Sequence, residues 1–156
     1  MTGRVESRLA ELGLELPILP TPTGSYLPYV ADGAVVYLAG QTNELGGVPT
    51  AHGQVPTLVG LEEAARAAEV CALNLLAALR QACDGDLDRV DRCLRVRGFV
   101  SAVPGFAQVP RIIDGASDLF VALLGEVGRH ARTAVGVATL PKNAVVEVDA
   151  VFKVRQ

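Results

Sequence analysis

The sequence lacks tryptophan, and its 156 residues include only four phenylalanines and three tyrosines. Half of the residues are hydrophobic, so the core must consist mainly of Val, Leu, Ala and Ile. Such a core offers few large rings, and we therefore expect no aromatic cage for a bulky ligand. The mean hydropathy of +0.34 is high for a small monomer, which favours a partner subunit that covers apolar surface.

An excess of basic charge is also missing. The chain has 14 basic and 17 acidic residues, a net charge of −3, and no run of Lys or Arg, which disfavours nucleic acid as a partner. Glu6, Glu11 and Glu15 interrupt the stretch in which a secretory signal would be apolar. The most apolar long segment, residues 64–83, carries charges of both signs and cannot span a membrane. These features predict a cytoplasmic protein without membrane insertion.

The three cysteines, at positions 71, 83 and 93, match neither a disulfide framework nor a zinc ribbon. This pattern fits a reducing compartment. Cys71 and Cys83 lie on the apolar stripe of an expected helix, where cysteine behaves as a small hydrophobic residue. We expect both to belong to the core.

Few residues have a pattern typical of metal binding or nucleophilic catalysis. The two histidines, His52 and His130, have no metal-ligand spacing, and no nucleophile or phosphate-loop motif is present. His52 is expected in an exposed loop; His130, which precedes Arg132 by two residues, either tunes a site or lies on the surface. The acidic run at 84–88 resembles the start of a calcium loop but lacks its Gly and its bidentate Glu. No metal site is predicted.

Hydrophobic periodicity predicts one α+β domain in which two long helices pack on one face of a mixed sheet. Thr57 is the expected N-cap of the first long helix, and Gly125 marks the end of the second. The Asp-Gly pair at 32–33 predicts a tight hairpin turn. The expected helices are 3–13, 58–83 and 108–127, and the expected strands are 29–30, 34–40, 92–102, 133–139 and 144–154.

Arg132 and Glu147 form the most informative pair of charges in the sequence. Arg132 stands just before the first of the two last strands, and Glu147 lies on the polar side of the second. If these strands pair through the turn at 141–142, the two residues lie near opposite ends of one hairpin. An exposed charge pair without a function is the simpler interpretation of spacing alone.

Five short segments are similar to motifs of one protein family. RTAVGVA at 132–138, LP at 140–141 and VEVDA at 146–150 resemble the C-terminal signature of the RidA/YjgF family of reactive-intermediate deaminases. Upstream, GSY at 24–26 and AGQ at 39–41 are similar to that family's Gly-Pro-Tyr and Ser-Gly-Gln. The resemblance covers residues 22–155, preceded by a helix and an extended lead-in at 1–21.

This resemblance implies a chorismate-mutase-like fold and a homotrimer with three clefts between subunits. It assigns Arg132 to a substrate carboxylate, Glu147 to the attacking water and Tyr26 to the lining of the cleft. Gly40 and Ala134 would contribute backbone groups to substrate binding. The implied reaction is hydrolysis of a 2-enamine or 2-imine to a 2-keto acid and ammonia, without metal or organic cofactor.

Three positions depart from the family pattern. Ala134 stands where many members have Cys, Ala39 where many have Ser, and Asp114 where Asn is typical. Asp114 would repel a substrate carboxylate, and the lost polar groups favour an alternative, a regulatory trimer that binds small carboxylates without turnover. Ribonuclease activity, a third class in this family, is disfavoured because the chain lacks a basic groove and an aromatic stacking platform.

Overall fold

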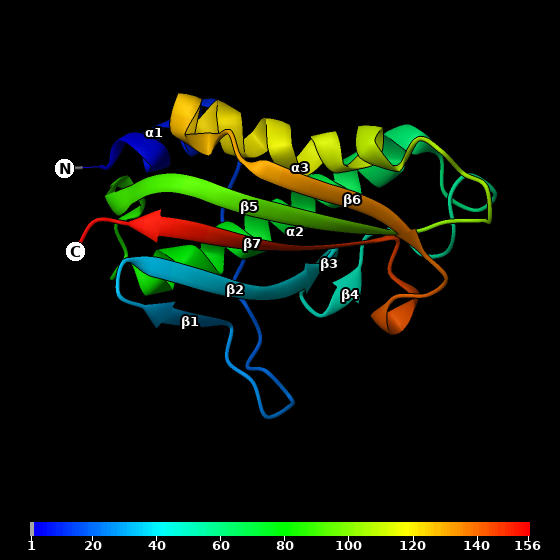
Figure 1. The fold of residues 1–156 in the computed structure, drawn as a ribbon, viewed down its shortest axis with the longest axis horizontal. Coiled ribbons are helices and arrows are strands. Elements are labelled where there is room, and N and C mark those ends of the chain that lie inside the picture. The colour runs from blue at the N-terminus through cyan, green and yellow to red at the C-terminus, as the bar shows by residue number, and fades with distance from the viewer. Residues whose placement is uncertain (1) are drawn as a thin grey trace.

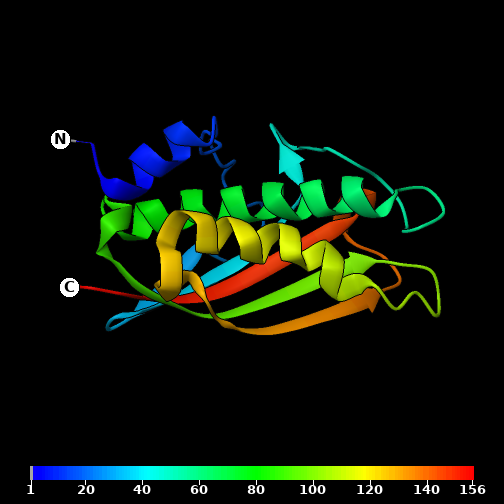
Figure 2. The same cartoon turned by 90° about the horizontal axis from the view of Figure 1, so that it is seen from above.

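A five-stranded sheet forms one layer of the molecule, and two long helices cover one of its faces (Figures 1 and 2). The computed structural model describes residues 2–156. The strand order is β1-β2-β7-β5-β6, with every pair antiparallel except β5 and β6. The expected α+β architecture is confirmed. The elements are β1 (Tyr29–Asp32), β2 (Val35–Thr42), α2 (Leu61–Ala82), β5 (Val90–Ser101), α3 (Val109–Leu124), β6 (Ala131–Val137) and β7 (Val146–Val154).

Several short elements connect the long helices and strands. β1 and β2 form the expected hairpin through Asp32 and Gly33. The other short elements are α1 (Arg4–Glu11), β3 (Glu44–Leu45), β4 (Val48–Pro49) and the 3₁₀ turns η1 (Leu87–Arg89), η2 (Gly125–Gly128) and η3 (Pro141–Asn143). No helix within residues 2–156 is both long and apolar enough to cross a membrane.

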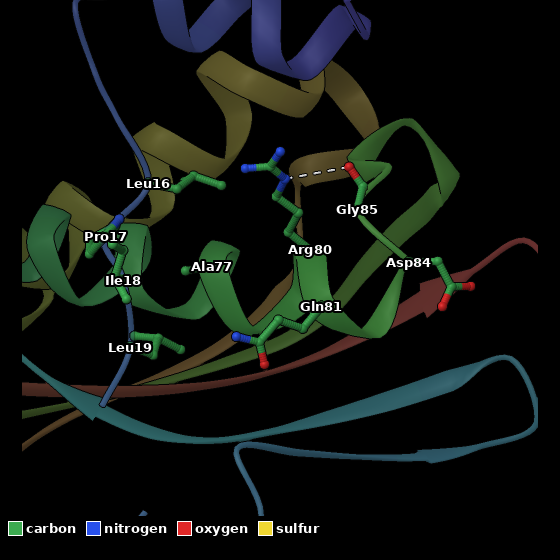
Figure 3. A pocket seen from close by; sticks show the side chains of 9 residues that line it. All are labelled: Leu16, Pro17, Ile18, Leu19, Ala77, Arg80, Gln81, Asp84 and Gly85. Carbon is green, nitrogen blue, oxygen red and sulfur yellow. Dashed lines mark hydrogen bonds between the residues drawn. The ribbon is translucent and has the colours of Figure 1, made fainter. Parts of the chain in front are cut away.

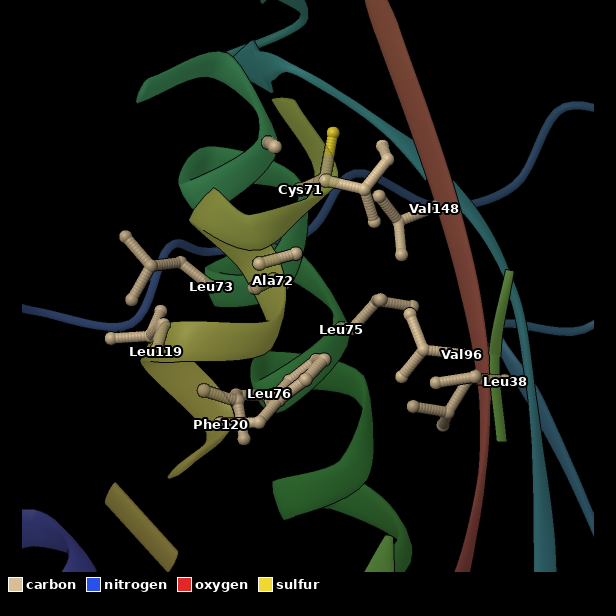
Figure 4. Packing of buried hydrophobic residues seen from close by; sticks show 14 of the residues in the cluster. Leu38, Cys71, Ala72, Leu73, Leu75, Leu76, Val96, Leu119, Phe120 and Val148 are labelled. Carbon is tan, nitrogen blue, oxygen red and sulfur yellow. The ribbon is translucent and has the colours of Figure 1, made fainter. Parts of the chain in front are cut away.

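The core lies between the sheet and the apolar stripes of α2 and α3 (Figure 4). Leu75 of α2 is fully buried and points toward Val96 of β5 and Leu38 of β2. Burying a side chain of this size stabilises the fold by about 1.5–3 kcal/mol. All three cysteines are buried and unpaired, as the helical stripe predicts for Cys71 and Cys83.

The start of α2 differs from the prediction. Gly60 is the N-cap and makes no side-chain cap, so the expected cap at Thr57 and helix start at Leu58 are wrong. Leu58 lies in a turn with 74% of its surface exposed. Leu58 is apolar and continues the helical spacing, so the sequence pattern predicted one helical turn too many although this side chain is not buried.

The two C-terminal strands do not form the expected hairpin. β6 pairs in parallel with β5, and β7 pairs antiparallel with both β5 and β2. The connection through η3 therefore passes the end of β5 instead of making a tight turn. Arg132 and Glu147 consequently lie on strands that are separated by β5.

The acidic run after α2 has a structural role. Asp88 accepts hydrogen bonds from the backbone N–H groups of Arg4, at 2.7 Å, and Val5, at 3.0 Å, and so caps α1. These bonds, the one from Arg4 foremost, lower the pKa of Asp88 despite some desolvation. Asp86 accepts a hydrogen bond from the N–H of Asp88 and caps η1.

Candidate functional site

Glu147 lies on the face of the sheet that the helices leave open. Its neighbours Val146 and Val148 are fully buried under the helices, and strand alternation turns Glu147 to the other side. It stands opposite Phe99 of β5 and Thr42 of β2.

Gly40 provides the space that the Glu147 side chain occupies. The pairing of β2 with β7 shifts register between Leu38 and Gln41, and Gly40 lies in this bulge. A Cβ at position 40 would lie 2.6 Å from Oε1 of Glu147. Bulges of this kind commonly re-aim side chains beside functional sites.

A cavity of about 340 Å³ opens over this part of the sheet. Glu147, Gly40 and Tyr26 all line it, and Tyr26 comes from the extended segment before β1 with 58% of its surface exposed. The structure therefore brings three of the six predicted site residues together within one chain.

Burial and a neighbouring charge both perturb the pKa of Glu147. Burial raises the pKa of this carboxyl, and the charge of Asp149 on the same face raises it further. Asp149 is itself held by two hydrogen bonds from Nε of Arg97, the shorter 2.9 Å, and one of 2.7 Å from Nη2. A carboxyl with a raised pKa in a cavity is suited to exchanging protons with a ligand.

Asn43 anchors the strand that carries Glu147, and no sequence pattern singles it out. It is fully buried, and its Oδ1 accepts hydrogen bonds from the backbone N–H groups of Val145, at 3.1 Å, and Val146, at 3.2 Å. Its Nδ2 donates to Oγ1 of Thr50 and to the carbonyl of Ala51, both at 3.1 Å. One isolated Asn has no periodicity, so a sequence pattern could not identify it.

Lys142 and Glu44 form a second charged group in the same cavity that sequence reasoning missed. Nζ of Lys142 lies 2.7 Å from Oε1 of Glu44 and donates to the carbonyl of Gly47 at 2.9 Å. The hydroxyl of Thr42 donates to Oε2 of Glu44 at 2.7 Å. Burial alone would raise the pKa of Glu44, but the bonds from Lys142 and Thr42 outweigh it and lower the pKa.

Arg132 belongs to a different group of residues, on the helix side of the edge strand β6. Its Nη1 donates to Oδ1 of Asp114 at 2.8 Å and to Oγ of Ser117 at 3.2 Å, and its Nη2 donates to the carbonyl of Pro110 at 3.3 Å. All three partners belong to α3. A separate cavity of about 250 Å³ opens beside Arg132, Ser117 and His130.

The six predicted residues thus form two groups in one chain. Tyr26, Gly40 and Glu147 share the open face, whereas Arg132 and Asp114 meet at the sheet edge under α3. Ala134 follows Arg132 on the same side of β6, opposite Gly98, and packs half-buried against the core. Arg132 and Glu147 therefore do not converge within a single chain.

Comparisons with known proteins agree with this architecture. The model of the YjgF/chorismate mutase-like family matches residues 6–153. The chain belongs to this family. Protein TCP17 of Trypanosoma cruzi is 43% identical over 155 residues, covering 97% of this chain and 95% of its own.

Two solved structures share the fold. The crystal structure of an Agrobacterium tumefaciens protein is 42% identical with a TM-score of 0.91, covering 97% of this chain and 93% of its own. The crystal structure of E. coli TdcF with bound serine, 21% identical over 88% of this chain and 93% of its own, has a TM-score of 0.57 and shows the fold alone.

A larger cavity of this YjgF-family chain, about 630 Å³, is lined by none of the six predicted site residues (Figure 3). It is bounded by the segment from Leu16 to Leu19 and by the end of α2. Nε of Arg80 there donates to the carbonyl of Gly85 at 3.4 Å. This cavity holds no histidine or cysteine, and we assign it no chemistry. Within residues 2–156 no three His, Cys, Asp or Glu side chains are placed to hold a metal ion.

Proposed function

We propose that this protein hydrolyses small 2-imino or 2-enamino acids to 2-keto acids and ammonia, in clefts between the subunits of a homotrimer. The observation that carries the proposal is the separation of Arg132 from Glu147 on opposite faces of one sheet. A site that uses both residues needs Arg132 from one chain and Glu147 from a neighbour.

Arg132 is the group that binds the substrate carboxylate. A guanidinium presents a planar pair of donors that matches a carboxylate, and it keeps its charge when partly desolvated. Asp114 occupies part of this fork in the free chain, so the substrate displaces Asp114 as it binds. Serine, the molecule bound in the TdcF crystal, is also a small carboxylate.

Glu147 and Tyr26 act at the reacting carbon. Glu147 holds the water that attacks the imine carbon, and its raised pKa suits it to carry a proton during the reaction. The ring of Tyr26 shapes the pocket, while backbone groups at Gly40 and Ala134 complete its walls. The reaction depends on positioning more than on a strong nucleophile.

Apolar side chains on the open face support the assembly into a trimer. Val30, Tyr37 and Val135 lie there with 53%, 50% and 41% of their surfaces exposed. Contact with other copies of the chain would cover such a face. Light scattering should give the mass of a trimer, and a stable monomer would contradict the proposed cleft.

Mixed trimers test the composition of the cleft directly. Each of Arg132→Ala and Glu147→Gln should abolish release of the keto acid from an imine that an amino-acid oxidase generates in the assay. When the two variants are co-expressed in equal amounts, about a quarter of the clefts combine an intact Arg132 with an intact Glu147. Activity should return to about that fraction, whereas a site within one chain predicts no recovery.

The Arg132–Asp114 contact favours a second function, binding of small carboxylates without turnover. This ion pair offsets part of the guanidinium charge that would bind and position a reacting imine. A cleft that binds carboxylates but hydrolyses no imine would act as a metabolite sensor. Calorimetry with a panel of small carboxylates distinguishes the two functions, since binding without keto-acid release in any imine assay would support the sensor.

A further inference from the structure

A chain of hydrogen bonds runs from Arg132 through Ser117 and His130 to the backbone. Nη1 of Arg132 lies 3.2 Å from Oγ of Ser117, and this oxygen lies 2.9 Å from Nε2 of His130. Nδ1 of His130 lies 2.7 Å from the carbonyl oxygen of Gly128. The pattern links a residue of β6 to one of α3 and to the end of η2.

The two ends of this chain fix the direction of its first and last hydrogen bonds. A guanidinium can only donate and a carbonyl can only accept, so Arg132 donates to Ser117 while Nδ1 of His130 donates to Gly128. When the ring is neutral, its proton lies on Nδ1, and the lone pair of Nε2 accepts the hydroxyl proton of Ser117. In this neutral state His130 is a base that accepts a hydrogen bond from Ser117.

The surroundings of His130 favour the neutral ring in the free chain. Burial lowers its pKa and the charge of Arg132 lowers it further, against the bond to Gly128, which raises it. Phe120 of α3 packs edge-on against the ring, with the centroids 6.1 Å apart. Four other charges surround the group: Asp114 and Asp118 on α3, Arg129 before β6, and Glu126 of η2, which lies 3.8 Å from Arg129.

We propose that Ser117 and His130 complete the carboxylate site of Arg132, and that His130 takes up a proton when a carboxylate binds there. This inference rests on the proposed function, which assigns the carboxylate to Arg132. The cavity of about 250 Å³ reaches all three side chains, so a bound anion lies near each of them. Its charge offsets that of Arg132 and removes the repulsion that disfavours a protonated ring.

Protonation of His130 also reverses the bond between His130 and Ser117. Nε2–H then donates to Oγ, and the hydroxyl proton of Ser117 turns toward the cavity, where the carboxylate accepts it. When a carboxylate is bound, Ser117 and His130 therefore supply one more hydrogen-bond donor, the Ser117 hydroxyl. Arg132 alone would bind the anion without this proton uptake.

The stored proton has a use in the proposed hydrolysis. Water adds to a neutral imine to give an adduct that carries one hydroxyl and one amino group on the same carbon. The hydroxyl of Ser117 then turns from the carboxylate to the neighbouring amino nitrogen, passes its proton to that nitrogen and receives one from Nε2 of His130. The C–N bond then breaks with its electron pair on ammonia, and the hydroxyl proton passes to the carboxylate of Glu147 as the carbonyl forms.

Nuclear magnetic resonance of the two histidines tests the coupling in the full-length protein. With ¹⁵N-labelled histidine, the His52→Gln variant identifies the ring of His130, and pyruvate serves as the carboxylate probe. Saturating pyruvate should raise the pKa of His130 by about one pH unit, and the neutral analogue pyruvamide should leave it unchanged. Affinity for pyruvate should then strengthen up to about tenfold from pH 8 to pH 5.5.

Two variants separate this role from a structural one. His130→Gln should remove the pH dependence of pyruvate binding while the variant stays folded, and Ser117→Ala should reduce the shift of His130 by more than half. Binding of pyruvate with an unchanged titration of His130 would overturn the proton uptake and leave the proposed function intact. Coupling without any turnover of imines would keep this inference and reject the hydrolysis. Failure of wild-type protein to bind pyruvate, or binding that survives Arg132→Ala, would overturn the carboxylate site and the inference with it.

Discussion

Gly40 of β2 lies directly beneath the carboxylate of Glu147 on β7, where a Cβ would stand 2.6 Å from Oε1. The contact forms because a bulge in β2 places Gly40 opposite the strand that carries Glu147. The glycine thus determines where the carboxylate lies, although the two residues are more than a hundred positions apart in sequence.

Gly40→Ala should therefore impair chemistry more than stability. The new methyl group meets the end of a flexible side chain, which rotates away at small cost to folding. Displacing Glu147 by about 1 Å should lower the rate of imine hydrolysis by roughly 100-fold. Steady-state kinetics and urea unfolding measure the two effects, with Gly60→Ala as a control because no atom lies within 4 Å of a Cβ there. Equal activity of the two variants would show that Gly40 does not position Glu147.

Glu147→Gln should make the protein more stable at pH 7. Because burial raises the pKa of Glu147 in the folded protein, the folded state binds more protons than the unfolded state, and wild-type stability falls as pH rises through this range. The difference between variant and wild type should vanish below the ordinary value of 4.5, where both states are protonated. Urea unfolding at pH 4 and pH 7 checks this, with the exposed Glu15→Gln as control. A difference that does not depend on pH would contradict the prediction.

Asp114→Asn should increase affinity for small carboxylates. The substitution removes a charge that competes for Arg132, and ion pairs as exposed as this one contribute at most about 1 kcal/mol. Calorimetry with pyruvate should show a gain of roughly two- to fivefold. Asp118→Asn is the matched control, since it removes a charge from the same helix, in the cavity beside Arg132, and leaves the ion pair between Arg132 and Asp114 intact. Weaker binding in Asp114→Asn would instead make Asp114 a group that contacts the ligand.

Asn43→Ala should destabilise the fold and loosen the start of β7. The substitution leaves the buried N–H groups of Val145 and Val146 without an acceptor, and we expect a loss of about 3 kcal/mol in the free energy of unfolding. Hydrogen exchange should become faster at these two amides. Gln81→Ala, at an exposed position of α2, should change the free energy of unfolding by less than about 0.5 kcal/mol. Unchanged protection of Val145 and Val146 would show that Asn43 does not anchor the strand.

The sequence by itself determined the elements and the fold class. Apolar residues recur over several turns of α2 and α3 and at alternate positions of β5 and β7. Because each pattern repeats, it identifies the buried face of its element reliably. Single-residue signals were less reliable. The predicted cap at Thr57 failed because Leu58 continued the apolar pattern outside the helix.

Tertiary structure alone decided how the site residues group. The sequence placed Arg132 and Glu147 in one hairpin, but β5 inserts between their strands, and alternation then turns the two side chains to opposite faces. Strand order depends on contacts between distant segments, which leave no local period in the sequence. For the same reason Asn43, Lys142 and the chain from Arg132 through Ser117 to His130 became visible only in the folded chain, where residues far apart in sequence lie within hydrogen-bonding distance.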